Sequence, residues 1–472
     1  MLRVYNTLSQ KKEIFRPRQN KKVNLFVCGP TVYDFSHIGH ARTYIAFDMI
    51  AKYLKEKGYK VFYLQNITDI DDKIIKRAKE KNITPKQLAR KFEKEYYKDM
   101  KALGITSVSK YARATDYIQE IINQVKKLIE KGVAYRINDG IYYDITKFKD
   151  YGKLSRRTVL QAEDAVSRID EAKEKRNKGD FCLWKFSKPG EPKWKSPWGW
   201  GRPGWHIEDT AITQKHFGYQ YDIHGGARDL IFPHHEAEIA QMEAISGKKP
   251  MAKYWLHTGF LTVEGKKMSK SLGNFITIRE FLKENSPQIL RMLVLKNHYR
   301  SPIDYSEKEI NQAKKELQRI AELVGKLKDI ASSKKKEKKD LGRLKKLILK
   351  TKKDFEKKMD NDFNTPEALA VIFGFVNKIN TLISKNKLKK EDAKKILNLF
   401  GWFDKILGIG LTKVHYRVRL SENIKLKDLV EKRERLRKER KWKEADKIRE
   451  RIKKLGYIIE DTKEGPRLKK ID

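Results

Sequence analysis

The chain has 472 residues, 39% of them hydrophobic, and a formal net charge of +44. This length allows about two to four domains with ordinary buried cores, and the charge attracts polyanions such as nucleic acid, although a lysine-rich composition from thermal adaptation would give the same charge. Because the sequence has no run of ~18 apolar residues and no apolar signal segment at its start, we expect a cytosolic protein without a transmembrane helix. Its two cysteines, Cys28 and Cys182, exclude a disulfide framework.

The first predicted elements form a strand–helix–strand unit. Residues 23–28 are predicted to be a short buried strand, and residues 40–57 a helix that ends at Gly58. Residues 60–64 are predicted to be a second apolar strand. This spacing is typical of a βαβ unit and indicates a parallel sheet.

The middle of the chain changes character. Residues 74–131 are mostly helical in pattern, and a segment at 139–145 is predicted to be a strand. Glycine, proline and tryptophan crowd the end of a region at roughly 115–200, which we interpret as an insertion between two halves of the sheet domain.

Sheet-like segments return at 221–224 and 255–262, and a helix is predicted from near Pro233 to near Gly247. From residue 306 the pattern is helical, with a linker or exposed helix end at 332–340 and a charged helix pair at 422–455 followed by a short tail. The basic residues are densest after residue 300. No internal repeat is found.

The segment CGPTVYDFSHIGHAR at 28–42 places two histidines at the start of the first helix. His37 and His40 are three residues apart, so their rings lie on one side of the first turn, where free N–H groups and the helix dipole favour an anion. Gly39 allows a base or phosphate to approach the backbone. The pattern suits ATP phosphates, and the alternative is a pair of surface histidines near a helix cap.

The segment KMSKS at 267–271 places Lys267 and Lys270 in a loop that glycine flanks. Two such lysines can clamp a pyrophosphate and stabilise its developing charge. A solvated basic loop is the alternative for this segment alone. Together, HIGH after the first strand and KMSKS some distance later resemble the two signatures of class I aminoacyl-tRNA synthetases.

A third group of residues suits a metal ion. Cys28 ends the first strand, where α/β sheets place their ligand crevice, and His234 and Glu238 share a helix face. A thiolate, an imidazole and a carboxylate are zinc ligands. The alternatives are a core cysteine and an ordinary pair on a helix face.

Further segments resemble one family within that class. They are GWHIE at 204–208, HGGARDLIFPHHEAEIAQ at 224–241, KMSKSLGN at 267–274 and NDFNTPEALA at 361–370. With them the chain resembles cysteinyl-tRNA synthetases from its first residue to its C-terminal tail.

The resemblance implies an α/β fold: a Rossmann-type parallel-sheet catalytic domain with an insertion, then an all-α helical bundle and a small C-terminal helical region. We expect six parts, which are the first catalytic half (1–114), the inserted connective domain that meets the tRNA acceptor end (115–200), the second catalytic half (201–262), the KMSKS and stem-contact region (263–305), the anticodon-binding bundle (306–412) and the C-terminal region (413–472).

The resemblance also implies one zinc ion per chain, bound by Cys28, Asp209, His234 and Glu238. Asp209 stands where the family usually has a second cysteine. Aspartate can ligate zinc through oxygen, but the site then has one sulfur ligand and is harder. Ala227 and Ala237 stand where we expect glycine and asparagine.

The expected reaction activates cysteine with ATP and Mg²⁺ and transfers it to the cysteine tRNA. Zinc would select the thiol of cysteine over the hydroxyl of serine, because it deprotonates and binds a thiol far more readily. By resemblance, the cysteine pocket contains Thr68, Trp205, His224 and Asp229, with Asp229 facing the ammonium group or, alternatively, a plain surface carboxylate. The ATP-binding residues are His37, Gly39, His40, Lys267, Ser269 and Lys270, of which both histidines and both lysines act in catalysis.

Two other functions stay open. One relative of this family joins cysteine to an amino-sugar, but it lacks a full anticodon-binding region. A non-catalytic RNA-binding protein is the second alternative, which Asp209 suggests and the two intact nucleotide motifs oppose. Trp402, Tyr416 and the basic run at 432–440 are candidates for RNA contact, with a core tryptophan and a solvated face as alternatives. We expect a monomer.

Overall fold

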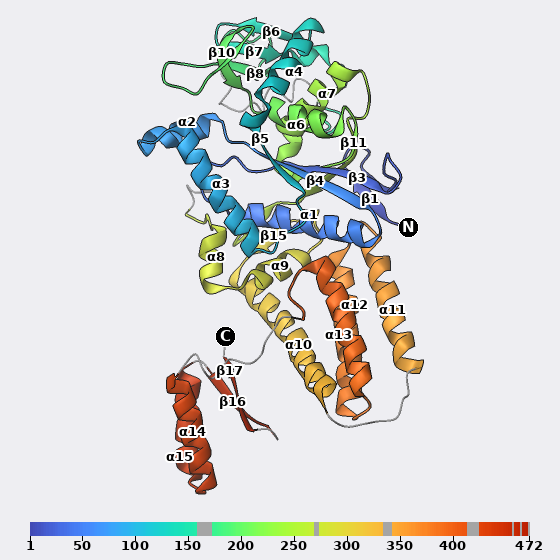
Figure 1. Ribbon diagram of the computed structural model, residues 1–472, viewed down its shortest axis with the longest axis vertical. Helices are drawn as coiled ribbons and strands as arrows, with labels where there is room; N and C mark the ends of the chain where they lie inside the picture. Colours follow the sequence, from blue (N-terminus) through green and yellow to red (C-terminus); the bar gives the residue numbers. More distant parts are fainter. Residues whose placement is uncertain are drawn as a thin grey trace. The chain divides into compact units, whose positions relative to one another are not determined.

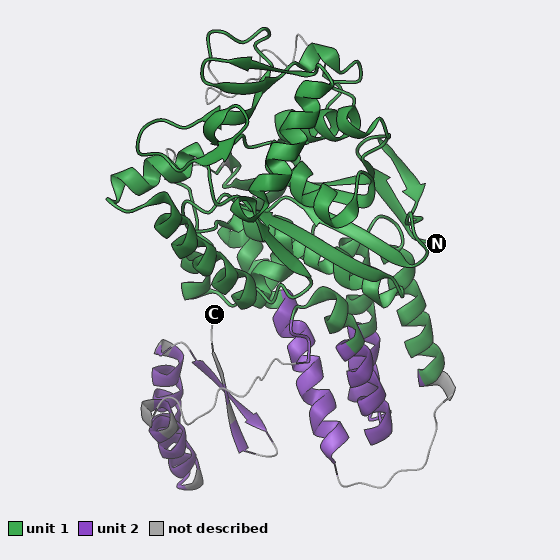
Figure 2. Ribbon diagram, turned by 45° about the horizontal axis from the view of Figure 1, so that its top comes forward, with its two compact units in different colours: residues 1–315, 345–375, 402–409 green, residues 316–344, 376–401, 410–472 purple. Residues whose placement is uncertain are grey.

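The computed structural model describes residues 1–157, 172–268, 273–333, 342–412, 424–455, 457–462 and 465–470 (Figure 1). The chain divides into two compact units (Figure 2). The first contains residues 1–315, 345–375 and 402–409, and the second contains residues 316–344, 376–401 and 410–472.

A parallel five-stranded sheet with the order β12-β11-β3-β4-β5 lies at the centre of the first unit. Its strands are β3 (Lys22–Val27), β4 (Lys60–Ile67), β5 (Lys110–Arg113), β11 (Tyr221–Ala227) and β12 (Ala252–Thr258). The helix α1 (Ile38–Glu56) joins β3 to β4. The predicted βαβ unit and the α/β fold class are therefore confirmed.

The strand order reverses between β3 and β11, because the chain leaves β3 toward β4 on one side and later leaves β11 toward β12 on the other. In Figure 1, α1 lies on one side of the sheet and α6 (Ile207–Phe217) on the other. Open α/β sheets bind their ligands at the carboxyl ends of the strands at such a switch point. The fold therefore places a ligand crevice beside Cys28 and His224.

A second sheet lies within the predicted insertion and extends three residues past its end. It has five strands in the order β6-β7-β8-β10-β9, and all its pairs are antiparallel. The strands are β6 (Ala134–Ile137), β7 (Gly140–Tyr143), β8 (Phe181–Phe186), β9 (Trp194–Ser196) and β10 (Gly199–Pro203). Trp184 of β8 belongs to the same buried core as Trp255 of β12, so this sheet packs onto the catalytic domain.

The region predicted to be mostly helical contains α2 (Asp72–Glu80), α3 (Pro85–Ala102) and α4 (Ile118–Glu130), with β5 between the last two. The helix predicted from near Pro233 ends at Gly247 as expected but begins later. Residues Ile231–His235 form a wide helical turn in which Phe232 is extended (φ −135°, ψ 132°), so the regular helix α7 spans Glu236–Ser246.

The remaining elements of the first unit are smaller. They are the hairpin β1 (Arg3–Asn6) and β2 (Lys11–Ile14), the sheet of β13 (Leu261–Val263), β14 (Lys266–Lys267) and β15 (Ile303–Tyr305), and the helices α8 (Ile278–Glu284) and α9 (Pro287–Leu295). The sequence patterns did not predict the hairpin, whose second strand is mostly exposed and therefore shows no apolar alternation.

Long helices follow, as predicted. They are α10 (Glu307–Ser332), α11 (Gly342–Met359), α12 (Thr365–Ser384) and α13 (Lys390–Leu407). Among the described residues, α12 alone is long and apolar enough to cross a membrane, with a third of its most apolar window buried. This is weak evidence for a membrane span, since core helices of globular domains meet the same criterion.

The chain ends in a small region of the second unit. The helices α14 (Ile424–Lys438) and α15 (Trp442–Lys454) precede an antiparallel hairpin of β16 (Tyr457–Thr462) and β17 (Gly465–Lys470). Leu426, Ile452, Ile459 and Leu468 belong to one buried cluster that joins both helices to the hairpin. The predicted helix pair is confirmed, whereas the hairpin was predicted only as a tail.

Candidate active site

The ends of β3 and β11 place a cysteine and a histidine beside each other. Cys28 directly follows β3, and its N–H donates to the carbonyl of Gly225 in β11 at 3.0 Å. A Cβ at Gly225 would lie 2.3 Å from the ring of Phe47, so only glycine lets α1 pack this closely against the strand. The Cys28 Sγ and the Nε2 of His224 are 3.5 Å apart.

The four predicted metal ligands meet at one point. Ligand atoms of Cys28, Asp209, His234 and Glu238 all lie within 4.8 Å of one another, and all four residues are buried. The Nε2 of His234 lies 3.1 Å from Asp209 Oδ2 and 3.2 Å from Glu238 Oε1. Asp209 comes from α6, Glu238 from α7 and His234 from the turn before α7, so segments far apart in sequence build the site.

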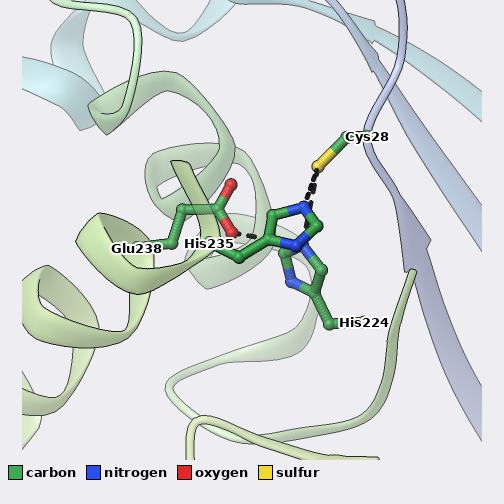
Figure 3. A group of neighbouring side chains, drawn as sticks. All are labelled: Cys28, His224, His235 and Glu238. Carbon is green, nitrogen blue, oxygen red and sulfur yellow. Dashed lines mark hydrogen bonds and ion pairs between the residues drawn. The ribbon is translucent and has the colours of Figure 1, made fainter. Parts of the chain in front are cut away.

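Two more histidines contact the same cluster, and Figure 3 shows them with Cys28 and Glu238. The Nε2 of His235 lies 3.1 Å from the Cys28 Sγ, and the Nε2 of His224 lies 3.1 Å from Glu238 Oε2. The sequence predicted His224 as part of the cysteine pocket and gave no role to His235. The adjacent pair His234–His235 in the quoted motif was the available signal.

Each of the three inner histidines has an outer partner for its Nδ1. These contacts are Tyr221 Oη to His224 at 2.7 Å, His206 Nδ1 to His234 at 2.8 Å and His257 Nε2 to His235 at 2.8 Å. Such outer contacts fix the ring orientation and the tautomer of metal-binding histidines. The sequence patterns did not predict roles for Tyr221, His206 or His257.

The anionic groups of the cluster repel one another, and His234 offsets part of this repulsion. Burial raises the pKa of the Cys28 thiol, and the carboxylates of Glu238 and Asp209 raise it further. Burial also raises the pKa of Glu238 to about 8, against the effect of His234. Burial alone would lower the pKa of His234, but Glu238 and Asp209 raise it to about 10. A cation among these groups would stabilise all three anionic forms.

The hydrogen bonding of the two buried carboxylates is incomplete. Asp209 Oδ1 is buried without a hydrogen-bond partner among the described residues, and the contacts of both Glu238 oxygens with His234 and His224 are not hydrogen bonds of good geometry. Buried polar atoms in native proteins are nearly always satisfied, and a missing partner indicates an ion or water. One sulfur, one imidazole nitrogen and two carboxylate oxygens are ligands that Zn²⁺ accepts, so the residues fit this metal.

The two histidines of the HIGH motif lie at the N-terminus of α1 with their rings stacked 3.8 Å apart. The Nδ1 of His37 accepts from the N–H of Gly39 at 3.1 Å, and the Nδ1 of His40 accepts from the N–H of His37 at 3.4 Å. The N–H of Ile38 donates to Ile276. We expected these three N–H groups to be free, but each has an acceptor within the protein. A phosphate would therefore contact the histidine side chains instead.

The two nucleotide motifs lie side by side. A Cβ at Gly39 would lie 2.8 Å from His37 Nδ1 and 3.4 Å from Met268 Cε of the KMSKS segment, so glycine makes room for both. His37 also forms a β-bridge with Thr277. Lys267 ends β14, whereas Ser269 and Lys270 lie outside the described residues.

Three of the four residues predicted for the cysteine pocket contact the cluster or its neighbours. Trp205 stacks on His234 with ring centroids 4.3 Å apart, and Thr68 donates to Glu208, next to Asp209, at 2.7 Å. His224 belongs to the cluster itself. Asp229 lies in a short turn after β11 and is exposed, so its role stays a prediction.

Comparisons with known proteins agree with this geometry. Residues 14–315 match the catalytic domain of class I (C) tRNA synthetases, residues 354–412 match the DALR domain, and residues 425–466 match the cysteinyl-tRNA ligase anticodon binding domain. The cysteine–tRNA ligase of Thermococcus gammatolerans is 49% identical over 481 residues, covering 100% of this chain and 99% of that protein. The cysteine–tRNA ligase of Heliobacterium modesticaldum is 45% identical, covering 99% of both chains.

Solved structures show the same fold at low sequence identity. The methionyl-tRNA synthetase of Mycobacterium tuberculosis with methionyl-adenylate has a TM-score of 0.59 at 15% identity, covering 83% of this chain and 88% of that one. The Agrobacterium radiobacter K84 agnB2 LeuRS–tRNA–LeuAMS complex has a TM-score of 0.62 at 12% identity, covering 85% and 86%. The chain therefore belongs to the cysteinyl-tRNA synthetase family of class I aminoacyl-tRNA synthetases, which are ligases.

Proposed function

We propose that the chain activates L-cysteine with ATP to cysteinyl-adenylate and transfers the cysteinyl group to the 3′ end of the cysteine tRNA, with zinc selecting the thiol. The observation that carries this proposal is the buried cluster of Cys28, Asp209, His234 and Glu238 next to the HIGH motif. Tyr44 connects the two, since its hydroxyl donates to the Cys28 carbonyl at 3.4 Å and its ring stacks on His40.

The selection problem explains why such a cluster is useful. Cysteine and serine differ by one atom, and a pocket that senses size alone separates near-isosteres by only ~1–3 kcal/mol. A bound zinc ion would supply a coordination position that prefers sulfur and lowers the pKa of a thiol. Cys28, Asp209, His234 and Glu238 would hold this ion, while Trp205 and Thr68 border the cysteine.

The reacting groups would be held by the two motifs. His37 and His40 would bind the phosphates of ATP through their side chains, beside Gly39, and Mg²⁺ would accompany the nucleotide. Lys267, Ser269 and Lys270 would close on the departing pyrophosphate, where fixed positive charge stabilises the transition state. Asp229 would face the ammonium group of cysteine.

The remaining parts of the chain would bind the tRNA. The match of residues 425–466 to an anticodon binding domain and the dense basic residues after 300 support phosphate contacts in this region. Tyr416 lies outside the described residues. Trp402 packs on Phe355 and donates to Glu56, which agrees with the alternative of a structural tryptophan. The six predicted part boundaries, the cytosolic location and the monomeric state stay parts of this proposal.

One assay tests the proposal against both alternatives. The purified chain is incubated with ATP, labelled cysteine and either a cysteine tRNA transcript or an amino-sugar. We expect labelled tRNA and no labelled sugar conjugate. Sugar conjugation without tRNA charging would identify the chain as an amino-sugar ligase, and the absence of cysteine-dependent ATP–pyrophosphate exchange would identify a non-catalytic RNA-binding protein.

A further inference from the structure

The carboxylate of Glu238 is shared between two histidines. Its Oε1 lies 3.2 Å from the Nε2 of His234, whereas its Oε2 lies 3.1 Å from the Nε2 of His224. The Cys28 thiol is placed in a similar way, since its Sγ lies 3.5 Å from His224 Nε2 and 3.1 Å from His235 Nε2. Cys28 and Glu238 can therefore each act as a ligand of an ion near His234 or of an ion near His224 and His235.

These contacts define a second group of ligands. Atoms of Cys28, His224, His235 and Glu238 all lie within 4.8 Å of one another, and every one of the four residues is buried. Figure 3 shows that both imidazoles and the thiol point toward the same space, which Glu238 approaches from α7. We call Cys28, Asp209, His234 and Glu238 the first set, and Cys28, His224, His235 and Glu238 the second set.

We propose that the second set is itself a metal-binding site, which holds a Zn²⁺ or Co²⁺ ion without Asp209 or His234. It overlaps the first set through Cys28 and Glu238, so the ion can lie at either of two neighbouring positions. The inference deepens the metal selection proposed above and rests on it only for the choice of metal.

The chemistry of the second set suits these metals. It offers one sulfur, two imidazole nitrogens and one carboxylate oxygen, whereas the first set offers one sulfur, one nitrogen and two oxygens. Zinc and cobalt are borderline ions that favour nitrogen and sulfur over oxygen. Asp209 contributes one of the two oxygens to the first set and nothing to the second. Compared with the cysteine that the family usually has at this position, Asp209 therefore weakens metal binding by the first set alone.

The outer contacts of the second set also suit ligands. The Nδ1 of His224 meets the hydroxyl of Tyr221 at 2.7 Å, and the Nδ1 of His235 meets His257 at 2.8 Å. His257 is in turn 2.8 Å from the hydroxyl of Thr7. The Nδ1 contacts thus fix both rings, and their Nε2 atoms face the Cys28 thiol. Metal-binding histidines are arranged in this way.

Two matched double variants test the inference in the full-length protein. Asp209→Ala with His234→Ala removes the two ligands found only in the first set, and His224→Ala with His235→Ala removes the two found only in the second. Each leaves Cys28 and Glu238. Co²⁺ is titrated into the metal-free proteins, and the near-ultraviolet thiolate-to-cobalt band reports binding. A Cys28→Ser variant, which lacks the shared sulfur, gives the background.

We expect the Asp209/His234 variant to bind one equivalent of Co²⁺ with a thiolate band and with an affinity within about 100-fold of the wild type, a loss of the size that altered metal surroundings cause. Its visible spectrum should differ from that of the His224/His235 variant. Where circular dichroism shows that the alanine variant does not fold, Asp209→Asn with His234→Gln keeps the volumes and replaces it.

The outcomes are distinguishable. If the wild type binds Co²⁺ but the Asp209/His234 variant binds no more than Cys28→Ser, the second set is not a metal site and the proposed function is unaffected. If the wild type binds neither Co²⁺ nor Zn²⁺, the inference and the proposed zinc selection are both wrong. Cysteine activation is not the readout, so loss of catalysis cannot imitate either result.

Discussion

Two groups of buried charges in the first unit are built in opposite ways. The carboxylate of Asp48 is fully paired: Oδ2 accepts from Arg291 at 2.8 Å and Lys52 at 2.7 Å, and Oδ1 accepts from the hydroxyl of Ser107 at 2.7 Å. Arg291 also donates to the carbonyls of Leu103 and Leu407. Asp48 and Arg291 are at most 1% exposed. Because each of these buried charges has partners, the pair is suited to a structural role.

The carboxylates of the metal-ligand cluster face histidines, but their hydrogen bonding is incomplete. Asp209 Oδ1 makes no hydrogen bond among the described residues, and the Glu238 oxygens, although 3.1 and 3.2 Å from His224 and His234, make none of good geometry. Such atoms cost free energy in the unliganded protein. We infer from this difference that Asp48 and Arg291 stabilise the fold, whereas the incompletely bonded carboxylates of the cluster leave room for a ligand.

We expect the strongest effect for Glu238→Gln, which removes a proposed ligand that both sets share. We expect loss of bound zinc and a fall in kcat/KM for cysteine activation of more than the roughly 10- to 100-fold that an outer-shell change costs, with little change for serine. In the metal-free protein, unfolding by urea should show equal or higher stability, because a buried carboxyl group with incomplete hydrogen bonding is replaced by a neutral amide. If the Glu238→Gln variant lost much stability but kept its metal, Glu238 would have a structural role like that of Asp48.

The opposite result is expected for Arg291→Met. It leaves the buried Asp48 carboxylate with fewer partners, and breaking a buried pair costs about 3–5 kcal/mol of unfolding free energy. The ratio of cysteine to serine activation in the folded fraction should not change. Urea unfolding and ATP–pyrophosphate exchange measure the two quantities. A stability loss below about 0.5 kcal/mol, the size of a surface substitution, would contradict the structural role.

A smaller effect is expected for His206→Phe. This change keeps an aromatic ring against Phe181 and Trp205 but removes the Nδ1 that faces His234. Zinc affinity should fall about 10- to 100-fold, because the ring of His234 loses the contact that orients it. His216→Phe is the matched control, because His216 contacts Tyr117 rather than the cluster. Equal affinities in a chelator competition would exclude an orienting role for His206.

The smallest effect concerns pH. Burial alone would raise the pKa of Asp48, but Arg291 and Lys52 hold it below its usual value. A lowered pKa means that the contribution of this group to stability is complete above its unfolded pKa of about 3.9 and is lost as pH falls through the lower folded pKa. The acid limb of the stability profile should therefore be shallower in Asp48→Asn than in the wild type. Identical slopes would argue against this linkage.

The sequence predicted the parts of the site that local patterns reveal. The apolar strand before Cys28, the helix after Gly39 and the later strand before His224 follow from periodicity and were found where expected. The four proposed ligands also meet as the resemblance required. The beginning of α7 was predicted three residues too early, because the pattern cannot distinguish the wide turn at 231–235 from a first helical turn.

What the sequence left out depends on tertiary contacts. His235 and His257 come from a turn and from β12, and only the parallel pairing of β11 with β12 brings them within 2.8 Å. No spacing in the sequence indicates that pairing. The shared use of Glu238 by His224 and His234 is likewise a property of the packed structure. The hairpin at the C-terminus was missed because its first strand, β16, buries only Ile459 and therefore shows no apolar alternation.

Removal and return of the metal shows whether a bound ion selects cysteine over serine. ATP–pyrophosphate exchange is measured with cysteine and with serine on the purified protein, after chelation, and after stoichiometric Zn²⁺ is added back. We expect chelation to abolish the preference for cysteine and added zinc to restore it. A protein shown by elemental analysis to be metal-free, yet still preferring cysteine to the original degree, would contradict selection of the thiol by zinc.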